Sequence, residues 1–267
     1  MNLAIIQARV SSTRLPGKVL KLILEKPMLS LQLERIRNSR RIDDLVVATS
    51  IEDSDNKIES LCKNMEISCF RGSLDDVLDR FYQAALPYKP EHIVRLTGDC
   101  PLIDPQIIDN VIYLYIKGEF DYASNTLEPT FPDGLDVEVF KFSILELACK
   151  EAFLPSHREH VTPFIYQHPE RFKIGHYKSQ ADLSHLRWSV DEPGDFDLVR
   201  QIYEELYPSN PVFTTKDILD LLDRNSSLCQ LNSHIVRNEG MKKSQEADIK
   251  FREKNPGTQR SIIHEKD

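Results

Sequence analysis

The sequence contains no C-x-x-C pair, and its five cysteines are scattered along the chain. This spacing signals neither a disulfide framework nor a zinc site. No apolar run approaches the ~18 residues that a membrane-spanning helix needs. Arg9 also interrupts the short apolar start, so no secretory signal is indicated. We therefore expect a cytoplasmic protein that has no membrane partner.

An excess of positive charge is also missing, because the formal net charge is -8 over 267 residues. Proteins that coat nucleic acid carry excess basic charge, so no nucleic-acid partner is expected and any cationic site must be local. Hydrophobic residues make up 40% of the chain, enough for the core of one large domain. We expect this domain over residues 1–231. The remaining residues, 232–267, form a polar extension that we expect to be partly disordered.

Strand-like apolar runs alternate with helical patterns in the first half of the chain. Strands are predicted at residues 3–6, 44–49, 67–70 and 92–96, and helices are predicted at 29–36, 58–62, 73–86 and 105–117. Such alternation is typical of right-handed crossovers and of a mainly parallel sheet with helices on both faces. The predicted class is therefore α/β. Ligands should lie beyond the carboxyl ends of the strands, where the loops that start at Gln7, Arg71 and Thr97 converge.

The second half of the chain is less regular. Strands are predicted at residues 133–140 and 172–177, and helices at 143–152, 158–168 and 195–207. In the first half, Ser73 and Asp76 form an S-x-x-D capping box where the helix of residues 73–86 begins. Asp104 with Pro105 is expected to cap the helix that follows.

Three cations lie close together after the first predicted strand, where the sequence reads ARVSSTRLPGK. Arg9, Arg14 and Lys18 could surround a triphosphate there, because a turn that leaves a parallel strand also points its backbone N–H groups at the crevice. The segment is not a Walker A loop, which needs glycine where Ser12 stands and Ser or Thr where Val19 stands. The alternative is a solvated basic loop, and the position at a strand end favours the phosphate site.

Two acidic residues, far apart in the sequence, follow strand-like runs. Asp99 comes after a predicted strand and Gly98 in RLTGDCPLID, and Asp191 precedes a helix opened by Pro193 in WSVDEPGDF. Two carboxylates, together with phosphate oxygens and waters, are typical of a Mg²⁺ site. A triphosphate needs such a metal to neutralise its charge during phosphoryl chemistry. In the alternative interpretation Asp99 is a turn residue and Asp191 caps the helix.

The motif ARVSSTRLPGK resembles the signature of the cytidylyltransferases that activate 3-deoxy-manno-octulosonate and acylneuraminates as CMP-sugars. The chain is most similar to the SpsF-type branch, named for spore coat polysaccharide biosynthesis. The segments that carry this similarity are RGSLDDVLDRF, RLTGDCPLID, PDGLDVEVF, REHVTPFI, WSVDEPGDF and RNEGMKKS. The resemblance implies a Rossmann-like nucleotidyltransferase fold, CTP as donor, Mg²⁺ as cofactor and a homodimer.

By position, the resemblance also implies roles for individual residues. The catalytic residues would be Arg9, Lys18, Asp99 and Asp191, with Asp99 and Asp191 as the metal ligands. The nucleotide would be bound by Ala8, Arg9, Ser11, Arg14, Lys18, Arg71, Asp76, Thr97 and Asp99. Arg71 and the first turn of its helix would lie near cytosine and ribose, although Asp76 could instead only cap the helix. The octulosonate enzymes read QGDEPLI where this chain has TGDCPLI, so their acceptor pocket does not carry over.

Two pairs of residues are candidates for binding the acceptor. Asp136 and Glu138 alternate with apolar residues in GLDVEVF, which places both carboxylates on one face of the predicted strand. They could bond to acceptor hydroxyls, or form a polar edge that faces solvent. Glu159 and His160 are assigned to the acceptor as well, with a structural role for His160 as the alternative. H-R-E-H lacks the H-E-x-x-H spacing of zinc enzymes.

The predicted reaction is in-line attack by a hydroxyl of a sugar-acid acceptor on the α-phosphorus of CTP, with release of pyrophosphate, for surface polysaccharide biosynthesis. Catalysis would then consist of positioning and charge stabilisation. One alternative is a metal-dependent glycosyltransferase, with Asp53-Ser54-Asp55 or Asp195-Phe196-Asp197 as its D-x-D pair. Both runs are predicted to cap helices instead. The other alternative is a nucleotide-binding module without turnover.

Overall fold

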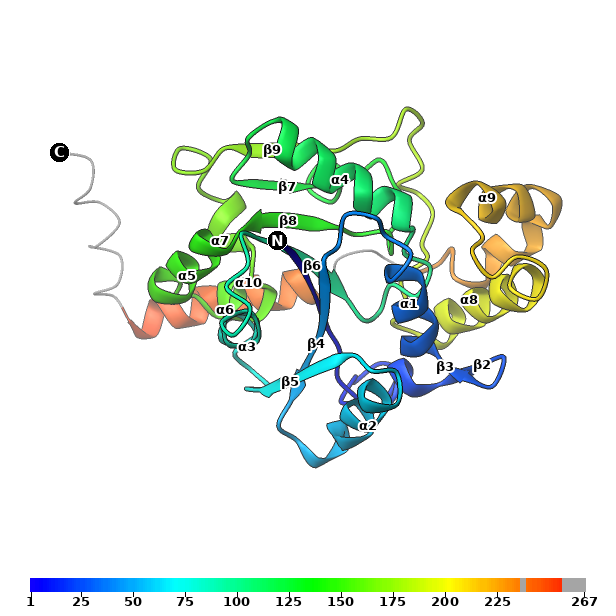
Figure 1. Ribbon diagram of the computed structural model, residues 1–267, viewed down its shortest axis with the longest axis horizontal. Coiled ribbons are helices and arrows are strands. Elements are labelled where there is room, and N and C mark those ends of the chain that lie inside the picture. The colour runs from blue at the N-terminus through cyan, green and yellow to red at the C-terminus, as the bar shows by residue number, and fades with distance from the viewer. Residues whose placement is uncertain (236–238, 256–267) are drawn as a thin grey trace.

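A seven-stranded sheet forms the centre of the part of the chain that the structure describes. The computed structural model describes residues 1–235 and 239–255, and of residues 239–243 and 245 only the backbone. The strands lie in the order β5-β4-β1-β6-β8-β7-β9 (Figure 1). Their bounds are β1 Asn2–Gln7, β4 Asp44–Ser50, β5 Ser68–Gly72, β6 His92–Thr97, β7 Tyr122–Ser124, β8 Glu138–Lys141 and β9 Ile174–His176. Only β8 runs antiparallel to its neighbours in this sheet, so the predicted mainly parallel α/β class is confirmed.

Helices cover both faces of this sheet. Their bounds are α1 Met28–Ile36, α2 Asn56–Asn64, α3 Val77–Ala85, α4 Pro105–Lys117, α5 Phe142–Glu151, α6 Pro155–His160, α7 Pro163–Tyr166, α8 Pro193–Leu206, α9 Thr215–Arg224 and α10 Glu239–Lys254. Ala4 and Ile6 of β1 share a core with α1, α2, α4, α8 and α9. Leu3 and Ile5 point the other way, into a core with α3, α5 and α7. The continuous apolar run of β1 is explained by this burial on both faces.

The carboxyl ends of the two central strands, β1 and β6, lie side by side. Gln7 is in register with Thr97, and the N–H of Gly98 donates to the Gln7 carbonyl at 2.8 Å. The loops that follow the two strands therefore leave the sheet together. This register brings the basic loop and Asp99 to the same edge.

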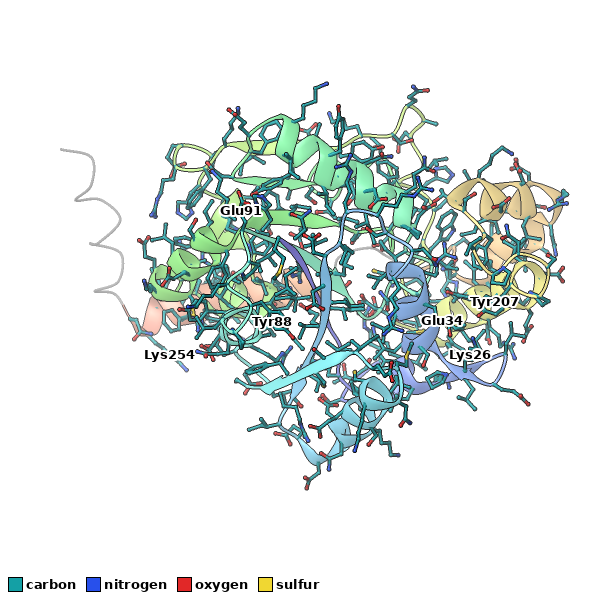
Figure 2. The ribbon with its side chains drawn as sticks, viewed as in Figure 1. Lys26, Glu34, Tyr88, Glu91, Tyr207 and Lys254 are labelled. Carbon is teal, nitrogen blue, oxygen red and sulfur yellow. The ribbon has the colours of Figure 1, made fainter. Side chains whose placement is uncertain are left out.

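A short hairpin, β2 Leu22–Ile23 and β3 Lys26–Pro27, joins the basic loop to α1. Lys26 donates to Glu34 of α1 at 2.7 Å and to the hydroxyl of Tyr207 at 2.9 Å, and that hydroxyl donates to Glu34 at 2.7 Å. Figure 2 shows the three side chains where the hairpin, α1 and the end of α8 meet. These bonds connect the end of α8 to the hairpin and to α1.

Three of the predicted elements differ in the structure, and β2, β3, β7 and α9 were not predicted. The strand expected at 133–140 begins only at Glu138, because Gly134 has a φ of +109°, which breaks the extended run. The helix expected at 158–168 is two short helices, since Val161 has a φ of +71° and Pro163 opens α7. Asp76 caps α3 by accepting from the N–H of Asp79, so this helix begins later than the proposed box at Ser73.

The polar extension contains a helix that its composition did not predict. α10 packs against α6, and the Asp248 carboxylate accepts from the N–H of Ser156 at 2.9 Å and from its hydroxyl at 2.5 Å. Phe251 adds an aromatic contact with Phe153. The expectation of disorder for residues 236–238 and 256–267 falls outside the described residues, and the domain boundary at residue 231 stays a prediction.

A buried carboxylate anchors the basic loop to the sheet. Asp55 is fully buried and accepts from the N–H of Val10 at 2.8 Å. It also accepts from the Thr49 hydroxyl at 2.9 Å and from the N–H and the hydroxyl of Ser50. Asp55 thus connects the loop after β1 to the carboxyl end of β4. This aspartate of the Asp53-Ser54-Asp55 run therefore has a structural role.

We expect Asp55→Ala to lower the free energy of unfolding by about 3 kcal/mol, because its donors would be left without an acceptor. Urea unfolding at pH 7 measures this loss. Asp53→Ala changes an exposed carboxylate in the same turn, so it should shift stability by no more than about 0.5 kcal/mol.

The pH dependence gives a second measure of the same anchor. Burial raises the pKa of Asp55, but the hydrogen bonds from Ser50, Val10 and Thr49 outweigh burial and lower it below its usual value. Its stabilisation is therefore complete above the unfolded pKa of about 3.9 and is lost as the pH falls through the folded pKa. The stability gap between wild type and Asp55→Ala should narrow at low pH. An equal gap at pH 7 and at about pH 3 would contradict this role.

Candidate active site

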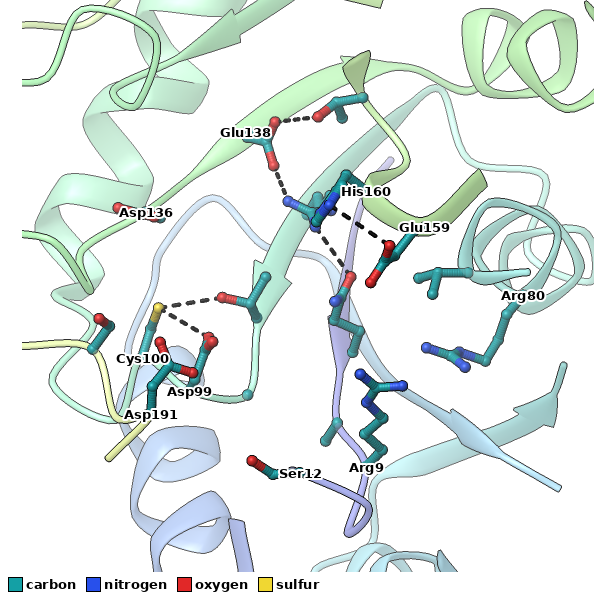
Figure 3. Close-up of a pocket in the computed structure, with 18 of the residues that line it drawn as sticks. Arg9, Ser12, Arg80, Asp99, Cys100, Asp136, Glu138, Glu159, His160 and Asp191 are labelled. Carbon is teal, nitrogen blue, oxygen red and sulfur yellow. Dashed lines mark hydrogen bonds and ion pairs between the residues drawn. The ribbon is translucent and has the colours of Figure 1, made fainter. Parts of the chain in front are cut away.

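A cavity of about 1030 Å³ opens beyond the carboxyl ends of β1 and β6. Figure 3 shows it with side chains from both halves of the chain. Of the predicted site residues, those that line it are Ala8, Arg9, Arg14, Lys18, Asp76, Thr97, Asp99, Asp136, Glu138, Glu159, His160 and Asp191. The structure therefore brings the N-terminal loop and the two distant aspartates together at one site.

The ammonium group of Lys18 lies between the two aspartates. Its Nζ is 2.9 Å from Oδ1 of Asp191 and 3.7 Å from Oδ2 of Asp99, and it donates to the Val190 carbonyl at 2.6 Å. Lys18 is nearly buried. A buried cation of this kind needs close negative partners, and the two carboxylates supply them.

Asp191 is the most heavily engaged of these acids. Oδ1 also pairs with Arg14 at 2.9 Å, and Oδ2 pairs with Arg187 at 2.9 Å. Burial raises the pKa of Asp191, but the charges and hydrogen bonds of Lys18, Arg14 and Arg187 outweigh burial and lower it. Asp191 is therefore ionised at neutral pH.

The alternative of Asp191 as a helix cap is wrong. The capping box of α8 is formed by Glu192 and Asp195, and Glu192 is the N-cap residue. The Asp195 carboxylate also accepts from the N–H of Asp191 at 3.0 Å and binds Arg187. The side chain of Asp191 is left free to point into the cavity.

A tight turn at Asp133 and Gly134 holds the Asp191 segment against the sheet. The Asp133 carbonyl accepts from the N–H groups of Trp188 at 2.6 Å and Ser189 at 2.8 Å. The next amide, that of Val190, donates to the Asp99 carbonyl at 2.7 Å. These backbone bonds tie the two aspartate-bearing segments together, so their separation does not depend on side-chain contacts alone.

The residues present fit a magnesium ion. Asp99 and Asp191 offer hard carboxylate oxygens around one point, occupied here by the Lys18 ammonium. Within residues 1–235 and 239–255, no group of three or more His, Cys, Asp or Glu side chains could hold a metal. Mg²⁺ commonly takes one or two carboxylates and completes its shell with substrate phosphates and water. Cys100, beside Asp99, is buried, and burial raises the pKa of its thiol.

Glu138 is buried, so the alternative interpretation, a polar strand edge that faces solvent, is wrong for this residue. Its carboxylate pairs with Arg95 and accepts from the hydroxyls of Tyr122 at 2.6 Å and Thr162 at 2.5 Å. Burial lowers the pKa of Arg95, but Glu138 outweighs burial and raises it. The pair is thus a charged part of the cavity wall. Asp136 lines the cavity from the irregular segment before β8.

Glu159 and His160 are joined through the C-terminal extension. The Ser244 hydroxyl of α10 donates to Glu159 at 2.7 Å and lies 2.9 Å from Nε2 of His160. Burial lowers the pKa of His160, which keeps the ring neutral at neutral pH. Because the single hydroxyl proton goes to Glu159, the ring proton lies on Nε2 and is donated to Ser244. A helix outside the expected domain therefore orients two cavity residues.

Ser11 and Arg71 do not line the cavity. The Arg71 guanidinium binds Asn56 at 2.5 Å, Glu59 at 3.0 Å and the carbonyl of Ser50 at 3.1 Å, so it is held against α2. The loop that follows it does line the cavity, at residues 73–77. Asp76, besides capping α3, pairs with Arg158 from α6.

Among the cavity arginines without an assigned role in the sequence prediction are Arg80 and Arg95. Each left a signal in the sequence. Arg80 follows Val77 by three residues, so it shares the inward face of the helix. Arg95 interrupts an apolar strand, where a charge is found only with a reason such as its pair with Glu138.

The D-x-D alternatives do not point into the cavity. Neither Asp53 and Asp55 nor Asp195 and Asp197 line it. Asp55 anchors the basic loop, and Asp195 binds Arg187 and Asn232. The signature expected of a glycosyltransferase is therefore structural here.

A mainly parallel sheet, a cationic loop after its first strand and a pair of carboxylates at its edge define the nucleotidyltransferase class. Comparison with known proteins narrows this class. The family model described as Cytidylyltransferase matches residues 3–244. The spore coat polysaccharide biosynthesis protein SpsF of Bacillus subtilis is 33% identical over 231 residues, which is 84% of this chain and 94% of that protein. The chain belongs to the cytidylyltransferase family and is thus a CTP-dependent nucleotidyltransferase.

Solved structures agree with this family. A cytidylyltransferase from Leptospira borgpetersenii has a TM-score of 0.82 and 35% identity, covering 86% of this chain and 96% of that chain. A CMP:2-keto-3-deoxy-manno-octonic acid synthetase complexed with CTP has a TM-score of 0.61 and 17% identity. The match covers 77% of this chain and 99% of that chain. The second similarity shows the shared Rossmann-like fold. In the residues that the structure describes, no helix is long and apolar enough to cross a bilayer.

Gly134 gives a test of how Asp191 is placed. A Cβ there would lie 2.4 Å from the amide nitrogen of Ser189 and 2.5 Å from the carbonyl carbon of Trp188, and the φ of +109° is strained for any other residue. We expect Gly134→Ala to cost about 3 kcal/mol or more of stability, measured by urea unfolding, because backbone atoms must shift.

The matched control is Gly17→Ala. Gly17 also has a positive φ, of +70°, but a Cβ there meets nothing within 4 Å. It should cost only about 1 kcal/mol. Equal losses in the two variants would show that the backbone contact at Gly134 does not hold the segment.

Proposed function

We propose that this enzyme transfers CMP from CTP to a hydroxyl of a sugar acid and releases pyrophosphate. The observation that carries the proposal is the Lys18 ammonium between Asp99 and Asp191, with Arg9 and Arg14 in the same cavity. The similarity to SpsF supports a role in surface polysaccharide synthesis. A relative in Arabidopsis thaliana, a 3-deoxy-manno-octulosonate cytidylyltransferase, supports a sugar-acid acceptor, with 35% identity over 144 residues.

Binding of the triphosphate would redistribute the cations of the site. Lys18 and Arg14 now neutralise Oδ1 of Asp191, whereas Arg9 has no carboxylate partner among the described residues. Phosphate oxygens carry more charge than a carboxylate and attract Lys18 and Arg14 toward the nucleotide. Their departure frees Oδ1 of Asp191, while Arg187 still holds Oδ2 in place.

Asp99 and the freed Asp191 would hold Mg²⁺. When bound, the ion supplies charge neutralisation at the α-phosphate and lowers the pKa of the attacking hydroxyl. The chain's own residues do the remaining work by positioning and charge stabilisation. As the new O–P bond forms at the α-phosphorus, the bond to pyrophosphate breaks and the proton of the attacking hydroxyl passes to solvent. Lys18 and Arg14 then stabilise the charge on the leaving group.

The acceptor would enter on the side of β8 and α6. Asp136, Glu159 and His160 line the cavity there, and Ser244 orients the last two. The Glu138 carboxylate already accepts three partners, from Arg95, Tyr122 and Thr162. We therefore propose that Glu138 shapes this wall and that Asp136 and Glu159 contact acceptor hydroxyls. The homodimer stays a prediction.

A pyrophosphate-release screen tests the activity. The four ribonucleoside triphosphates are each combined with a panel of sugar acids that includes 3-deoxy-manno-octulosonate and N-acetylneuraminate. We expect pyrophosphate to be released when CTP is combined with at least one sugar acid. The CMP adduct of that sugar acid should form in an amount equal to the pyrophosphate released. Tight CTP binding without release across the panel would support a binding module, and release of a nucleoside diphosphate from a sugar donor would support a glycosyltransferase.

Asp99→Asn tests the metal site. We expect turnover to fall at least about 100-fold, because one charged ligand is lost where the phosphate charge changes. Stability should change by no more than about 0.5 kcal/mol, since Asp99 is partly exposed and its nearest cation is 3.7 Å away.

The control for this variant is Asp75→Asn, which makes the same change at an exposed carboxylate in the same cavity. It should leave the dependence of turnover on Mg²⁺ concentration unchanged. Wild-type turnover and an unchanged Mg²⁺ dependence in Asp99→Asn would rule out its role as a metal ligand.

A further inference from the structure

Two arginines from different elements meet in the cavity, apart from the two aspartates. Arg9 comes from the loop after β1 and Arg80 from α3, and both line the cavity. Figure 3 shows their guanidinium groups directed toward one another, with Asp99 and Asp191 in another part of the cavity. Burial, and next the positive charge of Arg9, lower the pKa of Arg80 to about 10. The two cations therefore repel each other.

These arginines have no acidic partner. The cavity arginines Arg95, Arg158 and Arg187 each pair with a carboxylate. In contrast, no carboxylate among the described residues lies within 4.0 Å of a nitrogen of Arg9 or Arg80.

The carboxylates that act on Arg80 over a longer distance are already engaged. They belong to Asp55 and Asp76. Asp55 anchors the basic loop, and Asp76 pairs with Arg158. The positive charge at this end of the cavity is therefore not neutralised by the protein.

Arg80 is also incompletely hydrogen-bonded, although it is only 2% exposed. Nη1 donates to the carbonyl of Ser73 at 2.6 Å, but the buried Nε has no partner in the described structure. Arg35, which is 3% exposed, shows the usual arrangement. Its Nε and Nη2 donate to carbonyls at 2.7 and 3.0 Å, and its guanidinium stacks on Phe213. Arg35 also has no carboxylate partner among the described residues, so the difference lies in the buried Nε of Arg80, which is costly to leave without an acceptor unless a ligand supplies one.

We propose that Arg80 and Arg9 together bind an oxyanion of the phosphate class. A guanidinium presents a planar fork of donors that matches two oxygens of one phosphate, and two such groups can hold one phosphate from different sides. The oxyanion can come from the terminal phosphates of the nucleotide or from a phosphate group on the acceptor. The proposal deepens the proposed function and rests on it for the identity of the nucleotide.

The test compares wild type and Arg80→Gln by isothermal titration calorimetry, with inorganic pyrophosphate, CTP and cytidine as probes. Pyrophosphate affinity should fall about 10- to 100-fold, the effect expected for hydrogen bonds to a charged group. Cytidine affinity should not change. An unchanged pyrophosphate affinity in Arg80→Gln would overturn the proposal.

The same titrations distinguish the two sources of the oxyanion. If the site holds the nucleotide, CTP affinity falls together with that of pyrophosphate. If it holds an acceptor group, CTP affinity is kept and the loss appears for pyrophosphate added to enzyme saturated with CTP, whose own phosphates fill the nucleotide site. In either case the oxyanion site itself is supported.

Two further variants keep the test independent of folding. Arg35→Gln also removes a buried arginine, but one outside the cavity, so folded Arg35→Gln should bind pyrophosphate as wild type does. Arg9 is exposed, so Arg9→Gln should fold and show a loss similar to that of Arg80→Gln. If wild type binds pyrophosphate through Arg80 but no nucleotide releases pyrophosphate in the screen, the proposed function fails and the oxyanion site stands.

Discussion

The site depends on one charge arrangement, the ammonium of Lys18 held between Asp99 and Asp191 at 3.7 and 2.9 Å. Two carboxylates brought this close would repel each other, and burial would raise the pKa of Asp191. The cation offsets this repulsion and, together with Arg14 and Arg187, lowers the pKa of Asp191. It also connects the N-terminal loop to a segment more than 170 residues away. The same contact therefore joins two distant parts of the fold and forms part of the cavity.

Backbone geometry prepares this arrangement before any side chain contributes. The register of β1 with β6 places the basic loop beside Asp99, and the Val190 amide bonded to the Asp99 carbonyl brings the Asp191 segment to the same point. Asp55 fixes the basic loop from the other side through the Val10 amide. These main-chain bonds therefore position the two carboxylates independently of a bound nucleotide.

The cavity combines neutralised and unneutralised charge. Around Asp191 and Glu138, each cation has an acidic partner. Around Arg9 and Arg80 the positive charge has no such partner in the described part of the chain. This asymmetry explains how an acidic protein of net charge -8 can still offer an anion site. The C-terminal helix α10 reaches this cavity indirectly, because Ser244 contacts the lining residues Glu159 and His160.

The sequence by itself determined the α/β class, the strands and helices of the first half and the family, because hydrophobic periodicity and local motifs carry that information. It also named Lys18, Asp99 and Asp191, which do converge. Only the tertiary structure decided the rest. The carboxylate of Glu138 accepts hydrogen bonds from residues that lie far along the chain. The binding of Arg71 to α2 and the contact of Ser244 with His160 also depend on distant partners. A local pattern cannot specify such partners, since long-range contacts are fixed by packing of the whole chain and not by residue spacing.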